Sequence, residues 1–225
     1  MSKSLITLFL LLTFLSVTSL GQTKQDCLDF EGGILDRQVC NTKIRWKDSH
    51  ILWLLPDVFY STNVPAGISV NFYKADEDEL LNDFTPNSFV LRDILNKVIT
   101  VQPQYFWKEE NGVVNIYPLE DYSILRTTIK TFSIENSTKG EAIGKLLETA
   151  EFKHYLESKN LREQDTIIHG GVSTKTPKRY SFTLKNATVR EILNEIVRRD
   201  GNSTWIYQEY DTKNENEITH IYKLS

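Results

Sequence analysis

The sequence has little of the chemistry from which most catalytic and metal sites are built. Its 225 residues include only 2 cysteines, 1 methionine and 4 histidines. No two histidines have the spacing of a metal pair, and none lies in an HExxH helix; they are His50, His154, His169 and His220. A GxSxG elbow, a P-loop and a dinucleotide glycine fingerprint are all missing. The sequence therefore predicts no catalytic residue, no metal ligand, no cofactor and no enzyme activity.

Basic charge is also scarce. The chain carries 26 lysines and arginines against 30 aspartates and glutamates, a formal net charge of −4. General nucleic-acid binding needs a basic patch, so we expect no nucleic-acid partner. After the N-terminal segment, no stretch is long and apolar enough to cross a bilayer.

Residues 1–21 have the pattern of a signal peptide. Lys3 is the only charge, the apolar run LITLFLLLTFLSV follows it, and the small residues Ser19 and Gly21 precede the predicted cleavage point. An uncleaved membrane anchor is the alternative, but the run is short for a span, which needs about 20 residues. We therefore expect cleavage, a mature chain of residues 22–225, and a secreted or periplasmic location.

The two cysteines lie close together near the mature N-terminus, in the stretch CLDFEGGILDRQVC. Two such cysteines usually pair in an oxidising compartment, so we predict a disulfide between Cys27 and Cys40 that ties residues 22–45. The bridge would close a loop of about 14 residues, which the chain-entropy model values at about 3 kcal/mol. A metal or redox pair is the alternative, but the spacing differs from CxxC and no histidine lies nearby.

One phrase occurs twice along the chain. Residues 91–99 read LRDILNKVI and residues 189–197 read VREILNEIV. The apolar positions of each phrase recur at i, i+3, i+4, i+7 and i+8, which indicates an amphipathic helix with one buried face. The repetition therefore predicts two copies of one core helix. The solvent-exposed face of the later helix is predicted to carry Arg190, Glu191, Asn194 and Glu195.

The segments around each helix repeat as well. Before the later helix, YSFTLKNAT alternates as a half-buried strand does, and Thr188 and Glu191 have the spacing of a capping box. After it, STWIYQEYDTKNENEITHIYKL reads as two strands joined by a long polar turn. In the earlier copy, WKEENGVVNIY returns through a tight Asn-Gly turn, a strong hairpin signal. Trp107 and Trp205 hold the same repeat position, which favours packing of the hairpin aromatics in a core over a binding stripe.

We therefore predict an α+β protein with two small β-α-β-β domains, residues 46–120 and 121–225. Each has a mixed or antiparallel sheet covered by an amphipathic helix. A third, partial copy, FSIENSTKGEAIGKLL, repeats the strand and the capping box and is predicted to continue as helix to about Leu161. It makes residues 127–162 an inserted β-α segment of the second domain. Chance similarity between amphipathic segments is the alternative for this copy.

Three further patterns have both a structural and a functional interpretation. IIHGGVST, around His169, is similar to an esterase oxyanion loop but lacks the nucleophile elbow that such a loop requires. The acidic run ADEDELLNDF lacks the alternation and glycine turn of a calcium loop, so we interpret it as a solvated face. Asn136, Asn186 and Asn202 begin N-x-S/T sequons, yet asparagine also suits the strand-to-helix turns at the first two.

The stretch FTLKNATVREILNEIVRRDGNSTWIY resembles the secretin and TonB N-terminus short domain. The strand is Phe182–Leu184, the turn Asn186–Thr188, the helix Val189–Arg198, and the hairpin begins near Thr204; a looser match covers residues 68–118. The tandem layout also resembles that of secreted bacterial proteins. The resemblance implies small β-α-β folds in the bacterial envelope that serve as protein-interaction or assembly modules.

These observations predict an exported, non-enzymatic binding or protein-interaction module of the bacterial envelope, with another envelope protein as its partner. Two alternatives stay open. A secreted hydrolase would need carboxylates or a His-Ser pair to converge between the domains, with His169 as the candidate histidine. An extracellular carbohydrate binder would use the aromatic side chains of the hairpins.

Overall fold

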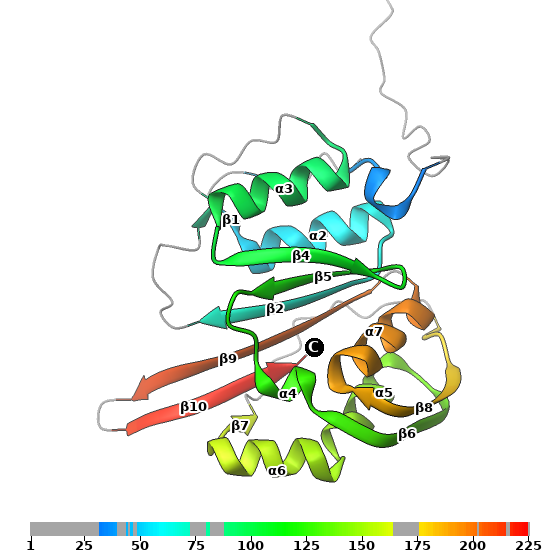
Figure 1. Ribbon diagram of the computed structural model, residues 1–225, viewed down its shortest axis with the longest axis vertical. Coiled ribbons are helices and arrows are strands. Elements are labelled where there is room, and N and C mark those ends of the chain that lie inside the picture. Colours follow the sequence, from blue (N-terminus) through cyan, green and yellow to red (C-terminus); the bar gives the residue numbers. More distant parts are fainter. Residues whose placement is uncertain are drawn as a thin grey trace, which may run out of the picture.

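The computed structural model describes most of the chain between residues 32 and 224 (Figure 1). The described ranges are 32–39, 44, 46, 49–72, 80–81, 88–163, 176–201, 203–214 and 217–224. Several predicted features lie outside them: the signal peptide, the disulfide between Cys27 and Cys40, His169 and the carboxylates of the acidic run.

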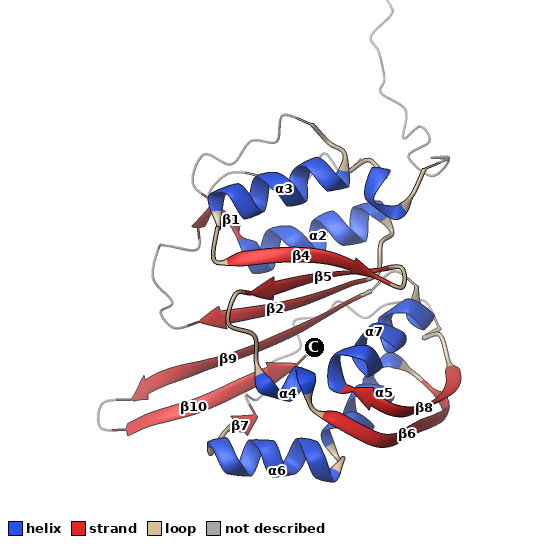
Figure 2. Ribbon diagram, in the orientation of Figure 1, coloured by secondary structure: helices blue, strands red, loops and turns tan. Residues whose placement is uncertain are grey.

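Strands from both repeats form one six-stranded sheet (Figure 2). Its order is β4 (Tyr105–Glu110), β5 (Val113–Pro118), β2 (Ala66–Phe72), β9 (Thr204–Asn214), β10 (Glu217–Leu224) and β7 (Arg162–Glu163). The pairs β4–β5 and β9–β10 are antiparallel hairpins, one from each repeat. Strand β2 lies between the hairpins and pairs in parallel with both β5 and β9. Backbone hydrogen bonds therefore join the two repeats directly.

Helices cover both faces of this sheet (Figure 1). On one face lie α2 (Ile51–Thr62) and α3 (Leu91–Val101), and on the other lie α4 (Ser123–Arg126), α5 (Lys139–Leu147) and α7 (Val189–Asp200). A second, antiparallel sheet of β6 (Thr128–Ser137) and β8 (Tyr180–Thr188) packs on the outer side of α5 and α7. The predicted α+β class is confirmed. The remaining elements are η1 (Ile34–Asp36), β1 (Ser49–His50), β3 (Leu80–Leu81) and α6 (Ala150–Lys159).

Each repeated helix packs its apolar stripe into a separate hydrophobic core. Helix α7 packs among β6, β8 and β9, while α3 packs with α2 on the opposite face of the large sheet. Full burial of one such side chain stabilises the fold by about 1.5–3 kcal/mol relative to exposure, so packing explains why these positions repeat. The buried residues are Leu91, Ile94, Leu95 and Val98 in α3, and Val189, Ile192, Leu193, Ile196 and Val197 in α7.

Capping boxes begin α5 and α7, as the sequence predicts. The Thr188 Oγ1 accepts a hydrogen bond from the Glu191 backbone N–H at 3.2 Å, and the Glu191 carboxylate accepts one from the Thr188 N–H at 2.7 Å. Thr138 and Glu141 repeat the arrangement. Each box satisfies two backbone donors that the helix itself leaves unpaired. Val90 holds the equivalent position before α3 and makes no side-chain cap.

Two asparagines turn the chain just before these capping boxes. Asn136 and Asn186 have φ of 44° and 50°, in the left-handed region that asparagine tolerates better than most residues. This geometry supports the structural interpretation of both asparagines within their sequons.

Two segments differ from the sequence prediction. The continuous helix predicted after the third repeat is in fact two helices, because α5 ends at Leu147 and Thr149 has an extended backbone before α6. The long polar turn predicted between β9 and β10 is also wrong, since the two strands pair as far as Asn214 and Glu217, which are only three positions apart in the chain. The extra residues of the later hairpin therefore lengthen its strands, where cross-strand hydrogen bonds satisfy their backbone groups.

The capping box of α7 gives the first testable prediction. We expect Thr188→Ala to lower the free energy of unfolding by about 1 kcal/mol, because Ala offers no acceptor to the Glu191 N–H. Urea denaturation followed by far-UV circular dichroism measures the change. Thr188→Ser keeps the hydroxyl and is the matched control; a loss as large for Ser as for Ala would contradict the capping role.

Candidate functional site

The β4–β5 hairpin turns through two residues with left-handed backbone. Asn111 and Gly112 have φ of 53° and 79°, which confirms the tight turn expected from an Asn-Gly pair. Because side chains alternate along a strand, Phe106 and Glu110 share one face of β4, and Trp107 lies on the other. The first face looks towards α4 and α7, and the second towards α3.

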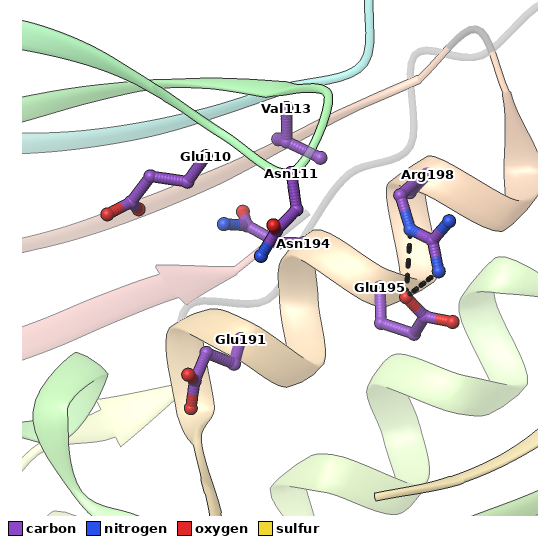
Figure 3. Close-up of a pocket in the computed structure, with 7 residues that line it drawn as sticks. All are labelled: Glu110, Asn111, Val113, Glu191, Asn194, Glu195 and Arg198. Carbon is purple, nitrogen blue, oxygen red and sulfur yellow. Dashed lines mark hydrogen bonds and ion pairs between the residues drawn. The ribbon is translucent and has the colours of Figure 1, made fainter.

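An open groove of about 490 Å³ lies between this hairpin, α4 and the start of α7. Part of its rim is apolar, since Phe106 is 41% exposed and Leu119 is 68% exposed. A smaller pocket of about 150 Å³ adjoins the groove, between the hairpin turn and α7 (Figure 3). Glu110 and Glu191 line both spaces, so the groove and the pocket are neighbours and together make up the candidate site.

The guanidinium of Arg190 is held between Asp121 and Tyr117 at this groove. Its Nη2 donates to Asp121 Oδ2 at 2.7 Å, and the two side chains are only 12% and 13% exposed. The Arg190 Cζ also lies 4.2 Å from the centre of the Tyr117 ring, a cation–π geometry. Ser69 Oγ donates to the other Asp121 oxygen at 3.2 Å. Removal of one partner would leave a buried charge uncompensated, so this group fixes α4 and α7 relative to the sheet.

A second polar group centres on Glu110. Its carboxylate accepts hydrogen bonds from the Tyr117 hydroxyl, from Lys108 Nζ at 2.9 Å and from Asn115 Nδ2 at 3.3 Å. Burial alone raises the pKa of Glu110, but the hydrogen bonds from Tyr117 and Lys108 and the charges of Lys108 and Arg190 outweigh it, so the pKa lies below its ordinary value. Burial and the bond to Glu110 raise the pKa of Tyr117.

These shifts decide what the groove can do chemically. A general acid or base works best with a pKa near the operating pH, whereas Glu110 stays ionised and Tyr117 stays protonated around neutrality. The carboxylates of Glu110 and Asp121 are paired with neighbouring side chains and hold three elements together, while the buried Arg190 Nε has no hydrogen-bond partner among the described residues. What the groove offers to a ligand is therefore mainly shape and apolar surface.

The same tryptophan–asparagine hydrogen bond occurs in both repeats. In the later repeat, Trp205 Nε1 donates to Asn194 Oδ1 at 2.8 Å, and in the earlier one Trp107 Nε1 donates to Asn96 Oδ1 at 3.1 Å. Each bond joins the repeated helix to the first strand of its hairpin. The two tryptophans differ in burial, however, because Trp205 is fully buried and Trp107 only partly.

Gly67 accounts for the complete burial of Trp205. It lies directly opposite Trp205 in the parallel register of β2 and β9. A Cβ atom at Gly67 would lie 2.2 Å from the indole ring, closer than any van der Waals contact permits. The absence of a side chain therefore allows β2 to lie against the indole, and any other residue at this position would force the strands apart.

Three tyrosines surround Glu209 on β9. Tyr207 and Tyr155 donate to Glu209 Oε1 at 2.7 and 2.9 Å, while the Tyr122 hydroxyl accepts from the Glu209 N–H at 3.1 Å and donates to the Val70 carbonyl at 2.7 Å. Burial raises the pKa of all three phenols, so they remain hydrogen-bond donors. The cluster braces α4 and α6 against the sheet, which is a structural role.

The histidines singled out by the sequence do not converge in the described part of the chain. His154 is exposed on α6, while the side chains of His50 and His220 and the whole of His169 lie outside the description. Among the described residues, no three His, Cys, Asp or Glu side chains gather where they would hold a metal ion. No helix within the same residues has the length and apolar character needed to cross a membrane.

Part of this site differs from the prediction. The prediction that Arg190 and Asn194 lie on a solvent-exposed helix face is wrong: their side chains are about 12% and 9% exposed, because the hairpin of the other repeat covers this face. Asp121 lies at the predicted domain boundary, where no sequence pattern marks it. The sequence does contain one indication that these residues matter: the arginine and the asparagine are identical in the two repeated helices. The arginine of the earlier helix, Arg92, also pairs with an aspartate, Asp36, at 3.4 Å.

The two asparagines give a matched pair of variants. We expect Asn194→Ala to lower the free energy of unfolding by about 1–3 kcal/mol, because it leaves the buried Trp205 N–H without an acceptor. Asn96→Ala should cost less than about 0.5 kcal/mol, since water reaches this exposed position. Urea denaturation followed by tryptophan fluorescence measures both. Equal losses would contradict the difference in burial.

The lowered pKa of Glu110 predicts a pH dependence. The ordinary value is 4.5; the stabilisation is complete above this value and is lost as the pH falls through the lower pKa of the folded state. The stability advantage of the wild type over Glu110→Gln should therefore shrink between neutral pH and about pH 3. Thermal unfolding across this range tests it, with Glu135→Gln, at an exposed position on β6, as the control. An advantage that grows on acidification would contradict the assignment.

Comparison of the chain with models of known protein families gives no match. Comparisons with curated proteins and with solved structures also give none.

Proposed function

We propose that this chain is an exported, non-enzymatic protein-interaction module of the bacterial envelope that binds a partner at the β4–β5 hairpin. The export component rests on the signal-peptide pattern of residues 1–21, and the envelope component on the resemblance of the repeats to the secretin and TonB N-terminus short domain. The single observation that carries the interaction component is a sheet edge that no described strand covers, beside an apolar groove.

The edge in question belongs to β4. Among the described residues, β4 pairs with β5 and with no other strand. The two-residue turn makes Glu110 and Val113 the closing pair of the hairpin, so every second residue back from Glu110 bonds to β5. The backbone N–H and C=O groups of Trp107 and Glu109 are then directed away from β5. Such groups form a template on which a further strand can pair.

The groove lies next to this edge. Phe106 stacks on Tyr117 with ring centroids 4.7 Å apart, and its exposed part faces the groove together with Leu119. An extended segment on β4 would form main-chain hydrogen bonds along the edge and place alternate side chains over this apolar surface. Main-chain bonds of this kind supply affinity, and the adjacent pockets supply specificity.

The two alternatives receive less support. A carbohydrate binder would present a stripe of hairpin aromatics to solvent, but only Phe106 and Trp107 are exposed or partly exposed among those whose side chains are described. The others, Tyr105, Tyr117, Trp205 and Tyr207, are at most 5% exposed. A hydrolase would need convergent polar groups that are available to a substrate, but the groove carboxylates of Glu110 and Asp121 are engaged by neighbouring side chains.

Site-specific photocrosslinking tests the proposed function. Benzoylphenylalanine is introduced at Glu109 on the β4 edge and, as the matched control, at Lys185, an exposed strand residue of β8. We expect illumination in an envelope extract of the source cell to yield a discrete adduct with one protein from position 109 and none from position 185. Equal labelling at both positions, or no adduct at 109, would contradict the proposal.

A further inference from the structure

The two repeats offer the same sheet edge, but only one of these edges is covered. Strand β9 begins the later hairpin as β4 begins the earlier one. On the side away from its hairpin partner, β9 is covered by β2, which pairs with it in parallel from Ala66↔Thr204 to Phe72↔Tyr210. On the equivalent side of β4, the described part of the chain supplies no strand. The covered edge therefore shows what the open edge is shaped to receive.

The backbone groups of the two edges are in the same phase. The closing pair of the earlier hairpin is Glu110↔Val113, three residues after Trp107, and that of the later hairpin is Asn214↔Glu217, nine residues after Trp205. In an antiparallel hairpin, residues an even number of positions from the closing pair bond to the partner strand, and those at odd separations point away from it. Both separations are odd, so both tryptophans direct their backbone N–H and C=O groups away from the hairpin partner. In β9 these groups face β2, and in β4 they face outward.

The indole rings are also held in the same way. Asn96 fixes the Trp107 N–H as Asn194 fixes the Trp205 N–H, and the partners are eleven positions apart in each case. The two indole rings differ in what lies against them. Gly67 lies against the Trp205 ring, which is fully buried, while Trp107 is only partly buried. Strand β2 pairs with the edge of β9 and meets the Trp205 indole there. A strand that pairs with the edge of β4 in the same way would meet the Trp107 indole at the equivalent position.

We infer that the outer edge of β4 binds an extended segment of a partner protein that runs parallel to β4 and places a glycine opposite Trp107. This inference rests on the proposed interaction function and specifies its ligand. The residues before and after the glycine lie on the groove face, beside Phe106 and Lys108 respectively. The segment therefore carries an apolar residue before the glycine, by the pairing preferences of adjacent strands, and the aliphatic stem of Lys108 allows an apolar residue after it as well.

A second copy of this chain is a weaker candidate for the occupant. At the other end of the sheet, the described edge belongs to β10, of which β7 covers only Ile221 and Tyr222. Strand β2 covers β9 over seven residues, with glycine at the critical position, whereas neither β10 nor β7 contains a glycine. The occupant is therefore assigned to a different protein.

The sequence of β2 itself provides a probe. A fluorescein-labelled peptide with the sequence NVPAGISVNF, residues 63–72, is titrated with the full mature chain and followed by fluorescence anisotropy. A matched peptide replaces the glycine with valine, whose Cβ meets the indole. We expect saturable binding of the glycine peptide below about 1 mM and at least about tenfold weaker binding of the valine peptide. Trp107→Ala should restore binding of the valine peptide to within about threefold, because the obstructing ring is gone.

Orientation is measured without altering the protein. The glycine peptide carries a photoreactive group at its N-terminal or its C-terminal residue, and the crosslinked positions are mapped by mass spectrometry. Parallel binding places the N-terminal group near Pro103, just before β4 begins, and the C-terminal group beyond Glu110, and the reverse pattern overturns the inference. This readout also decides the matter if Trp107→Ala fails to fold.

The outcomes separate this inference from the proposed function. If Glu109 captures a partner but the two peptides bind equally, the interaction function stands and the inference fails. If the peptides discriminate and bind in parallel while position 109 captures no protein from the extract, the edge chemistry stands and the proposed function fails. Light scattering that shows the mature chain to be a dimer dissociated by the glycine peptide would assign the edge to a second copy and overturn the inference.

Discussion

The parallel pairing of β2 with β9 is the interaction on which the rest of the structure depends. It brings a strand of the first repeat against the hairpin of the second, and Gly67 makes the approach possible by leaving room for the Trp205 ring. Because a parallel pair needs a long crossover connection, nothing local in the chain enforces it. Its stability comes from the helices that pack on both faces of the sheet and keep its backbone away from water.

The groove is a consequence of this pairing. Once the hairpins share a sheet, the β4–β5 hairpin of the first repeat lies over the polar face of α7 from the second. Arg190, Asp121 and Tyr117 then meet although they come from three separate segments. The buried charges of Arg190 and Asp121 compensate each other. The polar groups hold the hairpin in place, and the apolar rim and the strand edge are the surfaces at which we propose that a partner binds.

The tryptophan–asparagine bond shows how one local device serves two purposes. In the later repeat it orients an indole that a neighbouring strand then covers, so the bond belongs to the protein interior. In the earlier repeat the same bond orients an indole at the margin of the sheet. The two repeats differ little in sequence here. Their positions within the sheet make Trp205 a core residue and Trp107 a candidate binding residue.

The sequence by itself determined the local elements. The apolar stripes of residues 91–99 and 189–197, the Thr188–Glu191 capping box and the Asn111-Gly112 turn follow from periodicity and from hydrogen bonds between residues three or four positions apart. These contacts form wherever the segment lies, so their signals can be read directly from the chain.

Only the tertiary structure decided how the repeats combine. The contact between Gly67 and Trp205, the burial of Asn194 and the ion pair of Arg190 with Asp121 join residues that are distant in the chain. A polar residue at a helical position is equally compatible with solvent or with a covering hairpin, and periodicity cannot distinguish them. Whether such a residue is exposed or covered depends on which strands pair with each other, and that pairing is decided by packing over the whole sheet.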